Sequence, residues 1–417
     1  MIKNKILKST ALLFSLTSFS FAEDLSQLLE LSVNNKLLDA SKIALESKKL
    51  AYDSLKSSYL PSVTVGGKTQ MTSKETNSTP ENLSTIYGTI SYTIYDGGKR
   101  ENSYESHENS INSANSNVEY LKNQIALQII NNYYTYLSLL SQKEAKLQEI
   151  EQLKAQQIRL EAFLDVGSTT TDEVQKIVSR VESSNVELSE IDLNIETILH
   201  NLEYIIGKPV SISKGSKIEE NLEKGDALKA DIKALEYDTQ ALLSNAKAKK
   251  GDNLPMLSLN NTVTKYDLNY DSKNFNSDDY EQNVVSLNLS WKIFDFEATN
   301  KSYESAYKNY LASKSQLEYE KNKNDVDLNL AIRAYKISKQ KISSANLSLN
   351  AANSTYEAVK TKYQNGLVDN ISYLEALSEK FNAQSLLASA TYDLEIKKAN
   401  IIYLSGKNLE EYVKWLL

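Results

Sequence analysis

The sequence predicts a mainly α fold with a small antiparallel β part, built from a unit that occurs twice along the chain. The 417 residues include only 12 Gly and 4 Pro, whereas average usage would give roughly 29 and 21. Helices can therefore run over long distances without a breaker. Between them, short segments alternate between apolar and polar residues, which is the period of a half-buried strand. Both patterns recur in the second half of the chain, so an elongated, duplicated fold is expected.

The duplication can be followed residue by residue. The segment Ser-Tyr-Thr-Ile-Tyr-Asp at 91–96 aligns with Ser-Trp-Lys-Ile-Phe-Asp at 290–295, a shift of 199 residues. The same shift places Gly167 on Gly366 without an insertion. Because a repeated sequence unit predicts a repeated structural unit, each element assigned to one copy is expected in the other.

The two copies differ in length at one place. Leu60-Pro61 aligns with Leu254-Pro255 at a shift of 194 residues, so the second copy holds five extra residues before the shift of 199 begins. The extra length falls within segments 73–83 and 267–282, which are rich in Ser, Thr, Asn, Asp and Lys. This composition predicts exposed loops.

Each copy is predicted to contain one very long helix. Asp96 and Asp295 are placed to cap helix N-termini, and the breaker-poor stretches that follow run to about Phe163 and Lys362. At ~1.5 Å per residue, about 67 residues make a rod of ~100 Å. Such rods need coiled-coil-like packing on neighbours, because isolated helices are marginal in water. Shorter helices are predicted at 24–59, 170–206 and 226–253.

Four strands are predicted, as hairpins over 61–95 and 255–294. Their alternation is sharpest where Val285, Leu287 and Leu289 are interleaved with Ser and Asn. Strands of about 10–12 residues with one apolar face suit a tilted membrane-spanning strand. A bilayer tolerates no open sheet edge, and the smallest membrane barrels have eight strands. The strands of one chain are therefore expected to combine with those of further copies.

Residues 1–22 have the pattern of a secretory signal peptide. A basic start is followed by an apolar run over 11–21 and a small residue, Ala22. An uncleaved N-terminal anchor is the alternative, disfavoured because the run has about the length of a signal-peptide core. No cysteine follows, which excludes a lipoprotein anchor. The remaining segments are the first repeat 23–206 with a tip turn near 167, a linker or equatorial segment 207–225, the second repeat 226–406 with a tip turn near 366, and a C-terminal tail 407–417.

Composition also excludes several kinds of chemistry. The chain has no Cys, so thiolate nucleophiles, disulfides and iron–sulfur clusters are impossible, and its two His, His107 and His200, are too few for a multi-His metal site. Without its leader the chain has 44 basic and 54 acidic residues, a net charge of −10, which disfavours a nucleic-acid partner. No catalytic constellation or nucleotide-binding motif is present, so neither an enzyme nor a cofactor is expected.

The order of the junction motifs resembles that of a known family. Tyr95-Asp96-Gly97-Gly98 stands where strand gives way to long helix, and Val166-Gly167 and Asn365-Gly366 stand at the helix turns. Together with the Leu-Pro pair before each hairpin, they are similar to the TolC-like outer-membrane efflux channels over nearly all of 24–410. Phe296-Glu297 departs from this pattern, because glycines hold these positions in the first copy.

This resemblance implies a function and a set of partners. It implies a homotrimer in the outer membrane of a Gram-negative bacterium, where three chains close a twelve-stranded barrel in lipid above a twelve-helix periplasmic tunnel. Such channels export drugs, toxic compounds or proteins as part of a tripartite efflux or type I secretion system. The implied partners are a periplasmic adaptor, or membrane fusion, protein and an inner-membrane transporter.

The resemblance also implies roles for residues near the helix turns. It assigns the periplasmic gate to Glu173, Tyr363 and Glu375, with Glu375 in an acidic ring. Independently of the family, Gly167 and Gly366 can act as helix C-caps, and Thr170 with Glu173 has the spacing of a capping box. The residues expected to dock the adaptor are Val166, Gly167, Ser168, Gly366, Leu367 and Val368.

A secreted fibrous or filament-forming coiled-coil protein is the main alternative, because low Gly and abundant Ser and Asn would fit it as well. Strands with a lipid-type apolar face disfavour this alternative. A periplasmic adaptor would also contain a long helical hairpin, but the Gly- and Val-rich barrel segments expected of one are missing.

Overall fold

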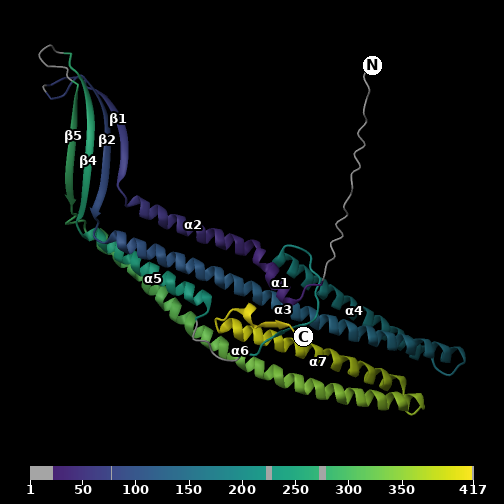
Figure 1. Cartoon of the computed structure of the whole chain (residues 1–417). Helices are drawn as coiled ribbons and strands as arrows, with labels where there is room; N and C mark the ends of the chain where they lie inside the picture. The colour runs from purple at the N-terminus through teal and green to yellow at the C-terminus, as the bar shows by residue number, and fades with distance from the viewer. Residues whose placement is uncertain (1–21, 77, 222–227, 272–278, 416–417) are drawn as a thin grey trace, which may run out of the picture.

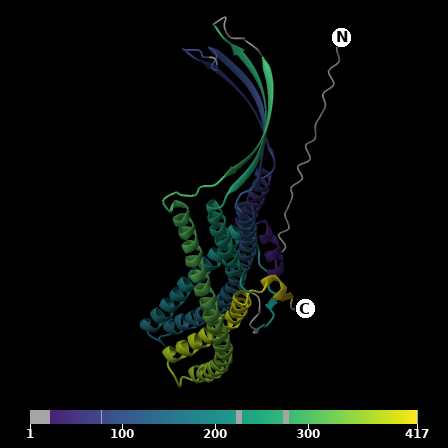
Figure 2. The ribbon, with the colours of Figure 1, turned by 90° about the vertical axis from the view of Figure 1, so that its left-hand side faces the viewer.

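The computed structural model describes residues 22–76, 78–221, 228–271 and 279–415. The molecule is elongated, with a small sheet at one end and two helical hairpins whose turns lie at the other (Figure 1). The view turned by 90° shows the same separation (Figure 2). The mainly α fold, its antiparallel sheet and the repeated order of elements are confirmed. Apart from Ala22, the predicted signal peptide lies outside the described residues.

The long helices have the predicted lengths. Helices α3 (Lys99–Asp165) and α6 (Ala298–Gln364) contain 67 residues each, and each turns back into a shorter helix, α4 (Thr171–Ile206) or α7 (Asn370–Leu404). Extensive contacts along both hairpins supply the packing that a rod of this length requires. Within the described part of the chain, no helix is long and apolar enough to cross a membrane.

The prediction of one helix over 24–59 is wrong, because the chain breaks at Asn35. Its backbone is extended, and its side-chain Oδ1 accepts from the N–H groups of Leu37 and Leu38 at 2.9 and 3.2 Å. Its Nδ2 donates to the carbonyl of Ile205 at 2.6 Å, which ties this break to the end of α4. The resulting elements are α1 (Leu25–Leu31), the 3₁₀ turn η1 (Ser32–Asn34) and α2 (Lys36–Ser58).

The second copy has a corresponding short helix. Helix α5 (Ala230–Lys250) runs into the 3₁₀ turn η2 (Gly251–Asn253). Helix α3 packs against both α2 and α5, whereas α6 packs against α5. The helices below the sheet therefore lie in the order α2, α3, α5, α6.

The four strands form one antiparallel sheet in the order β1-β2-β4-β5. The register places apolar residues of all four strands on the same face, and Val65, Leu287 and Leu289 on this face are 75%, 64% and 70% exposed. The opposite face is mainly polar and includes a hydroxyl contact of 3.0 Å between Thr89 and Thr262. The strands are β1 (Ser62–Met71), β2 (Asn82–Tyr95), β4 (Met256–Asn269) and β5 (Tyr280–Ser290).

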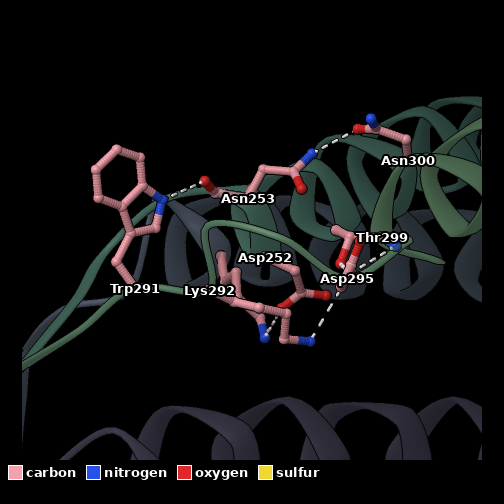
Figure 3. A network of polar contacts seen from close by, with 8 residues as sticks. Asp252, Asn253, Trp291, Lys292, Asp295, Thr299 and Asn300 are labelled. Atoms are coloured by element: carbon pink, nitrogen blue, oxygen red, sulfur yellow. Dashed lines mark hydrogen bonds and ion pairs between the residues drawn. The ribbon is translucent and has the colours of Figure 1, made fainter. Parts of the chain in front are cut away.

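Several predicted strand boundaries are corrected. The loop predicted at 73–83 is shorter at its second end, because β2 already begins at Asn82, and the loop predicted at 267–282 is shorter at both ends, because β4 and β5 continue into it. Residues 77 and 272–278 lie outside the described residues. The second hairpin was predicted to reach 294, but β5 ends at Ser290. The matching part of β2 is paired with β4, whereas β5 is an edge strand of the single chain. Trp291 instead donates its indole N–H to the carbonyl of Asn253 at 3.0 Å (Figure 3).

The junctions between strand and long helix differ from the prediction. The N-cap residues are Gly98 and Glu297, both left-handed with φ of 78° and 66°, rather than Asp96 and Asp295. Asp295 still stabilises the start of α6 from a position before the N-cap, because its Oδ2 accepts from the backbone N–H and the hydroxyl of Thr299 at 3.1 and 2.5 Å (Figure 3). The second copy keeps a backbone conformation that suits glycine, although it lacks the glycines.

The linker between the copies meets the C-terminal tail beside α7. Strand β3 (Ser216–Ile218) pairs with β6 (Val413–Trp415), which follows the 3₁₀ turn η3 (Leu409–Tyr412). On its other side, the N–H of Ile218 donates to Glu395 at 2.8 Å, and its carbonyl accepts from Lys398 at 3.3 Å. Glu395 and Lys398 form a buried ion pair on α7, and this pair satisfies the backbone groups of Ile218 that a neighbouring strand would otherwise bond.

Candidate functional site at the helical tip

The two tip turns have the same hydrogen-bonded geometry. At the first, Gly167 has φ of 70° and its N–H donates to the carbonyl of Leu164 at 2.9 Å, while Ser168 donates to Phe163 at 2.8 Å. The second turn repeats both bonds around Gly366, with φ of 71°. This pattern is a Schellman motif, in which the left-handed C′ position favours glycine. The predicted C-cap role of both glycines is confirmed.

The residues expected to dock a partner lie together on these turns, at the end of the molecule opposite the sheet (Figure 1). Val166 and Leu367 are each 73% exposed. Gly167, Ser168 and Gly366 are also exposed, and Val368 is half-buried. Each turn therefore presents one large apolar side chain to its surroundings.

The predicted capping box at the start of α4 is wrong. Thr170 is the N-cap residue, but its side chain makes no capping hydrogen bond. Glu173 does not reach back either, because its carboxylate contacts Lys176 at 2.8 Å and Asn370 at 3.4 Å. Glu173 is thus available to link α4 with α7.

A polar network joins the two hairpins near the tip. Buried Gln156 on α3 donates from Nε2 to the hydroxyl of Tyr363 at 2.6 Å and to Oδ1 of Asn370 at 3.2 Å. Asn370, the first residue of α7, donates in turn to Glu173. The candidate gate residues Tyr363 and Glu173 are therefore connected through Gln156 and Asn370. Sequence reasoning missed both connecting residues.

Aromatic and cationic groups surround Tyr363. Its ring stacks on that of Tyr373 with 5.0 Å between centroids, and the guanidinium of Arg159 lies 5.6 Å from its ring centroid. Burial raises the pKa of the Tyr363 hydroxyl, against the lowering effects of the Gln156 hydrogen bond and the Arg159 charge. The phenol therefore stays neutral near pH 7 and keeps its hydrogen bond with Gln156.

Glu375 lies apart from this network. It is exposed and lines a groove of about 690 Å³ between α4 and α7, together with Lys176 and Arg180. Arg180 donates to Ser378 on α7 and lies 3.5 Å from the buried carboxylate of Glu149 on α3. The structure thus joins two of the three candidate gate residues by hydrogen bonds and places the third in a neighbouring groove, whose lining residue Lys176 also contacts Glu173.

Comparison with known proteins decides the family. The sequence profile of the family described as outer membrane efflux protein matches residues 28–208 and again 226–407, which together make up most of the chain. The chain belongs to the outer membrane efflux protein family. As an outer membrane efflux protein, it is located in the outer membrane, with a helical part in the periplasm. The two matches follow the same duplication that the sequence and the fold show.

Individual relatives of this outer membrane efflux protein agree. The outer membrane protein TolC of Salmonella enteritidis is 23% identical over 314 residues, which are 71% of this chain and 60% of TolC. The chain thus matches less than two thirds of the length of that relative. A membrane protein from Pseudomonas aeruginosa superposes with a TM-score of 0.83 at 14% identity, covering 93% of this chain and 95% of the other. The outer membrane channel CmeC of Campylobacter jejuni gives 0.81 at 18% identity, covering 93% and 86%.

Proposed function

We propose that the chain forms a homotrimeric outer-membrane channel that exports small molecules, such as drugs and toxic compounds, or proteins from the periplasm. The observation that carries this proposal is the sheet, whose apolar face runs across all four strands while both edge strands stay open. Lipid solvates an apolar face, but it leaves unpaired backbone groups at an edge unsatisfied. Three copies supply twelve strands, enough to close a barrel, whereas one chain does not reach the minimum of eight.

The helices extend this conduit away from the membrane. Their turns carry exposed Val166 and Leu367, which support docking of a periplasmic adaptor at the six tip residues assigned above. The adaptor would connect the channel to an inner-membrane transporter, in a tripartite efflux or type I secretion system. The transporter must supply the energy, because the sequence contains no nucleotide-binding motif. The description of the family, outer membrane efflux protein, supports this assignment.

The resting constriction is assigned to the tip. The network from Tyr363 through Gln156 and Asn370 to Glu173 holds the α6–α7 hairpin against the α3–α4 hairpin. Glu375 is assigned to a ring near the threefold axis, where three carboxylates would attract cations. This gives the gate two separable parts, one that sets the opening and one that sets the charge.

The mass of the protein in detergent and its conductance test this function. We expect a trimer, with a monomer that has no stable membrane-inserted form, because four strands leave two unpaired edges in lipid. Purified trimers should conduct ions in planar bilayers. A monodisperse monomer that conducts would refute the assembly, and extraction without detergent would favour the fibrous alternative.

We expect the loops between paired strands to face the outside of the cell. The end of β1 and the start of β2, like the end of β4 and the start of β5, lie at the end of the sheet farthest from the helices (Figure 1). An epitope tag inserted after Thr76 should be labelled by antibody on intact cells. The matched control is the same tag after Gly167, which should be labelled only after the outer membrane is permeabilised. The opposite result for the two tags would reverse the orientation.

A further inference from the structure

One seam inside the chain joins the two copies of the repeat. Strand β2 of the first copy pairs with strand β4 of the second, with Gly88 opposite Val263 and Tyr92 opposite Leu259. Below the sheet, α3 of the first copy packs against α5 of the second. The seam therefore consists of the later strand of one repeat beside the earlier strand of another.

The same two kinds of strand stand unpaired at the edges. By the shift of 199 residues, β5 is the equivalent of β2, and by the shift of 194 residues, β1 is the equivalent of β4. They occupy opposite ends of the strand order, so they can meet only when β5 of one chain pairs with β1 of another. Repeating such a head-to-tail contact generates a closed ring when the rotation allows it.

We propose that the contact between the two repeats inside one chain is the template for the contact between neighbouring chains. This template fixes which residues of β5 pair with which residues of β1 in the next chain. Applying the two shifts to the β2–β4 pairs places Leu287 opposite Thr69, Leu289 opposite Gly67, and Trp291 opposite Val65 of the next copy. This register rests on the proposed trimer, but it specifies which residues meet.

The two faces of the sheet agree with this register. Leu287 and Leu289 lie on the apolar face, and so do Val65 and Gly67 of β1. A slip by one residue would place these side chains opposite the polar face of the neighbour, at the cost of the common apolar surface. The register also accounts for the early end of β5, because Trp291 has its strand partner only in the next copy.

The helices below the sheet carry a matching hydrogen-bond donor. Ser106 on α3 donates from its hydroxyl to the carbonyl of Ala241 on α5 at 2.9 Å. By the same shifts, Ser305 on α6 is equivalent to Ser106, and Ser47 on α2 of the next chain is equivalent to Ala241. Both residues are exposed in the single chain. Helix α2 also exposes Ile43 at 69%. A neighbour seated in the template geometry covers this surface.

Disulfide cross-linking tests the register without background, because the natural chain has no cysteine. We expect the double variant Leu287→Cys with Thr69→Cys to give covalent dimers and trimers on denaturing gels after mild oxidation. Opposite residues in an antiparallel pair have Cα atoms about 4.5–5.5 Å apart, within disulfide range. Gly88→Cys with Val263→Cys, the template pair, should cross-link within one chain and give no ladder.

Displaced pairs decide between registers. Leu287→Cys combined with Gly67→Cys or with Met71→Cys moves one partner by two residues, about 7 Å along the strand, so ladder formation should drop at least several-fold. A stronger ladder from either displaced pair overturns the register while the trimer stands. A trimer by mass without any ladder overturns the strand seam. A monomer by mass refutes the proposed assembly together with the seam.

Discussion

Replacing Gln156 with Leu is expected to raise the single-channel conductance of the trimer. Gln156 is buried and bonds Tyr363 and Asn370 at once. Leucine keeps a similar volume but leaves the hydroxyl of Tyr363 and Oδ1 of Asn370 without the donor that Gln156 supplies in the closed tip, which costs about 1–3 kcal/mol in each chain. Both partners regain water when the tip opens. The ratio of closed to open tips should therefore fall by about tenfold per chain.

The neighbouring residue provides the control for this experiment. Gln157 lies on the same helix, but it is only half-buried, and its side chain bonds Glu161 within that helix at 2.8 Å. Gln157→Leu should conduct like the parent protein in planar bilayers, whereas Gln156→Leu opens more often or to a larger level. If both variants conduct like the parent, the network does not hold the gate.

Substituting Gly97 by Ala is expected to lower the thermal stability of the trimer strongly. Gly97 has φ of 75°, and a Cβ there would lie 2.4 Å from the carbonyl oxygen of Gly251 and 2.9 Å from Cβ of Leu254. The backbone of η2 would have to move away from the junction. The left-handed conformation and the overlap together should cost about 2–5 kcal/mol.

Gly98 separates the two contributions. Its φ is 78°, but only the flexible amide of Asn102 lies near the place of a Cβ, at 3.7 Å. Gly98→Ala should therefore lose only the conformational part, about 1–2 kcal/mol. The midpoint of heat dissociation of the trimer on gels gives both values. Equal losses for the two variants would show that the close approach to Gly251 contributes nothing.

Most of the architecture was predictable because it depends on local signals that the repeat doubles. The scarcity of Gly and Pro gave both long helices, and alternation gave the four strands. Asn35 was missed because its capping signal sits inside a helical apolar pattern and its amide bonds Ile205, distant in sequence. Phe296 and Glu297 were also missed, since their left-handed backbone does not follow from their residue types.

The candidate site was predictable only in part, for a related reason. Tyr363 and Glu173 could be located only through the family resemblance, which implies gate residues at set distances from the two tip glycines. Gln156 and Asn370, which connect them, are 214 residues apart and carry ordinary polar side chains, so only the packed tip shows that they meet. Thr170 was assigned a capping role from spacing alone, but Glu173 has partners on α4 and α7 that compete with that role.

The equal lengths of α3 and α6 constrain how this chain can change during evolution. Each is 67 residues long, and the two hairpins meet again at the tip through Gln156 and Asn370. Deleting one helical turn from a single copy would shift its tip by about 5.4 Å and separate these partners. Insertions and deletions in the rods should therefore be inherited in matched pairs, whereas the loops beyond the sheet, which already differ by five residues, can change independently.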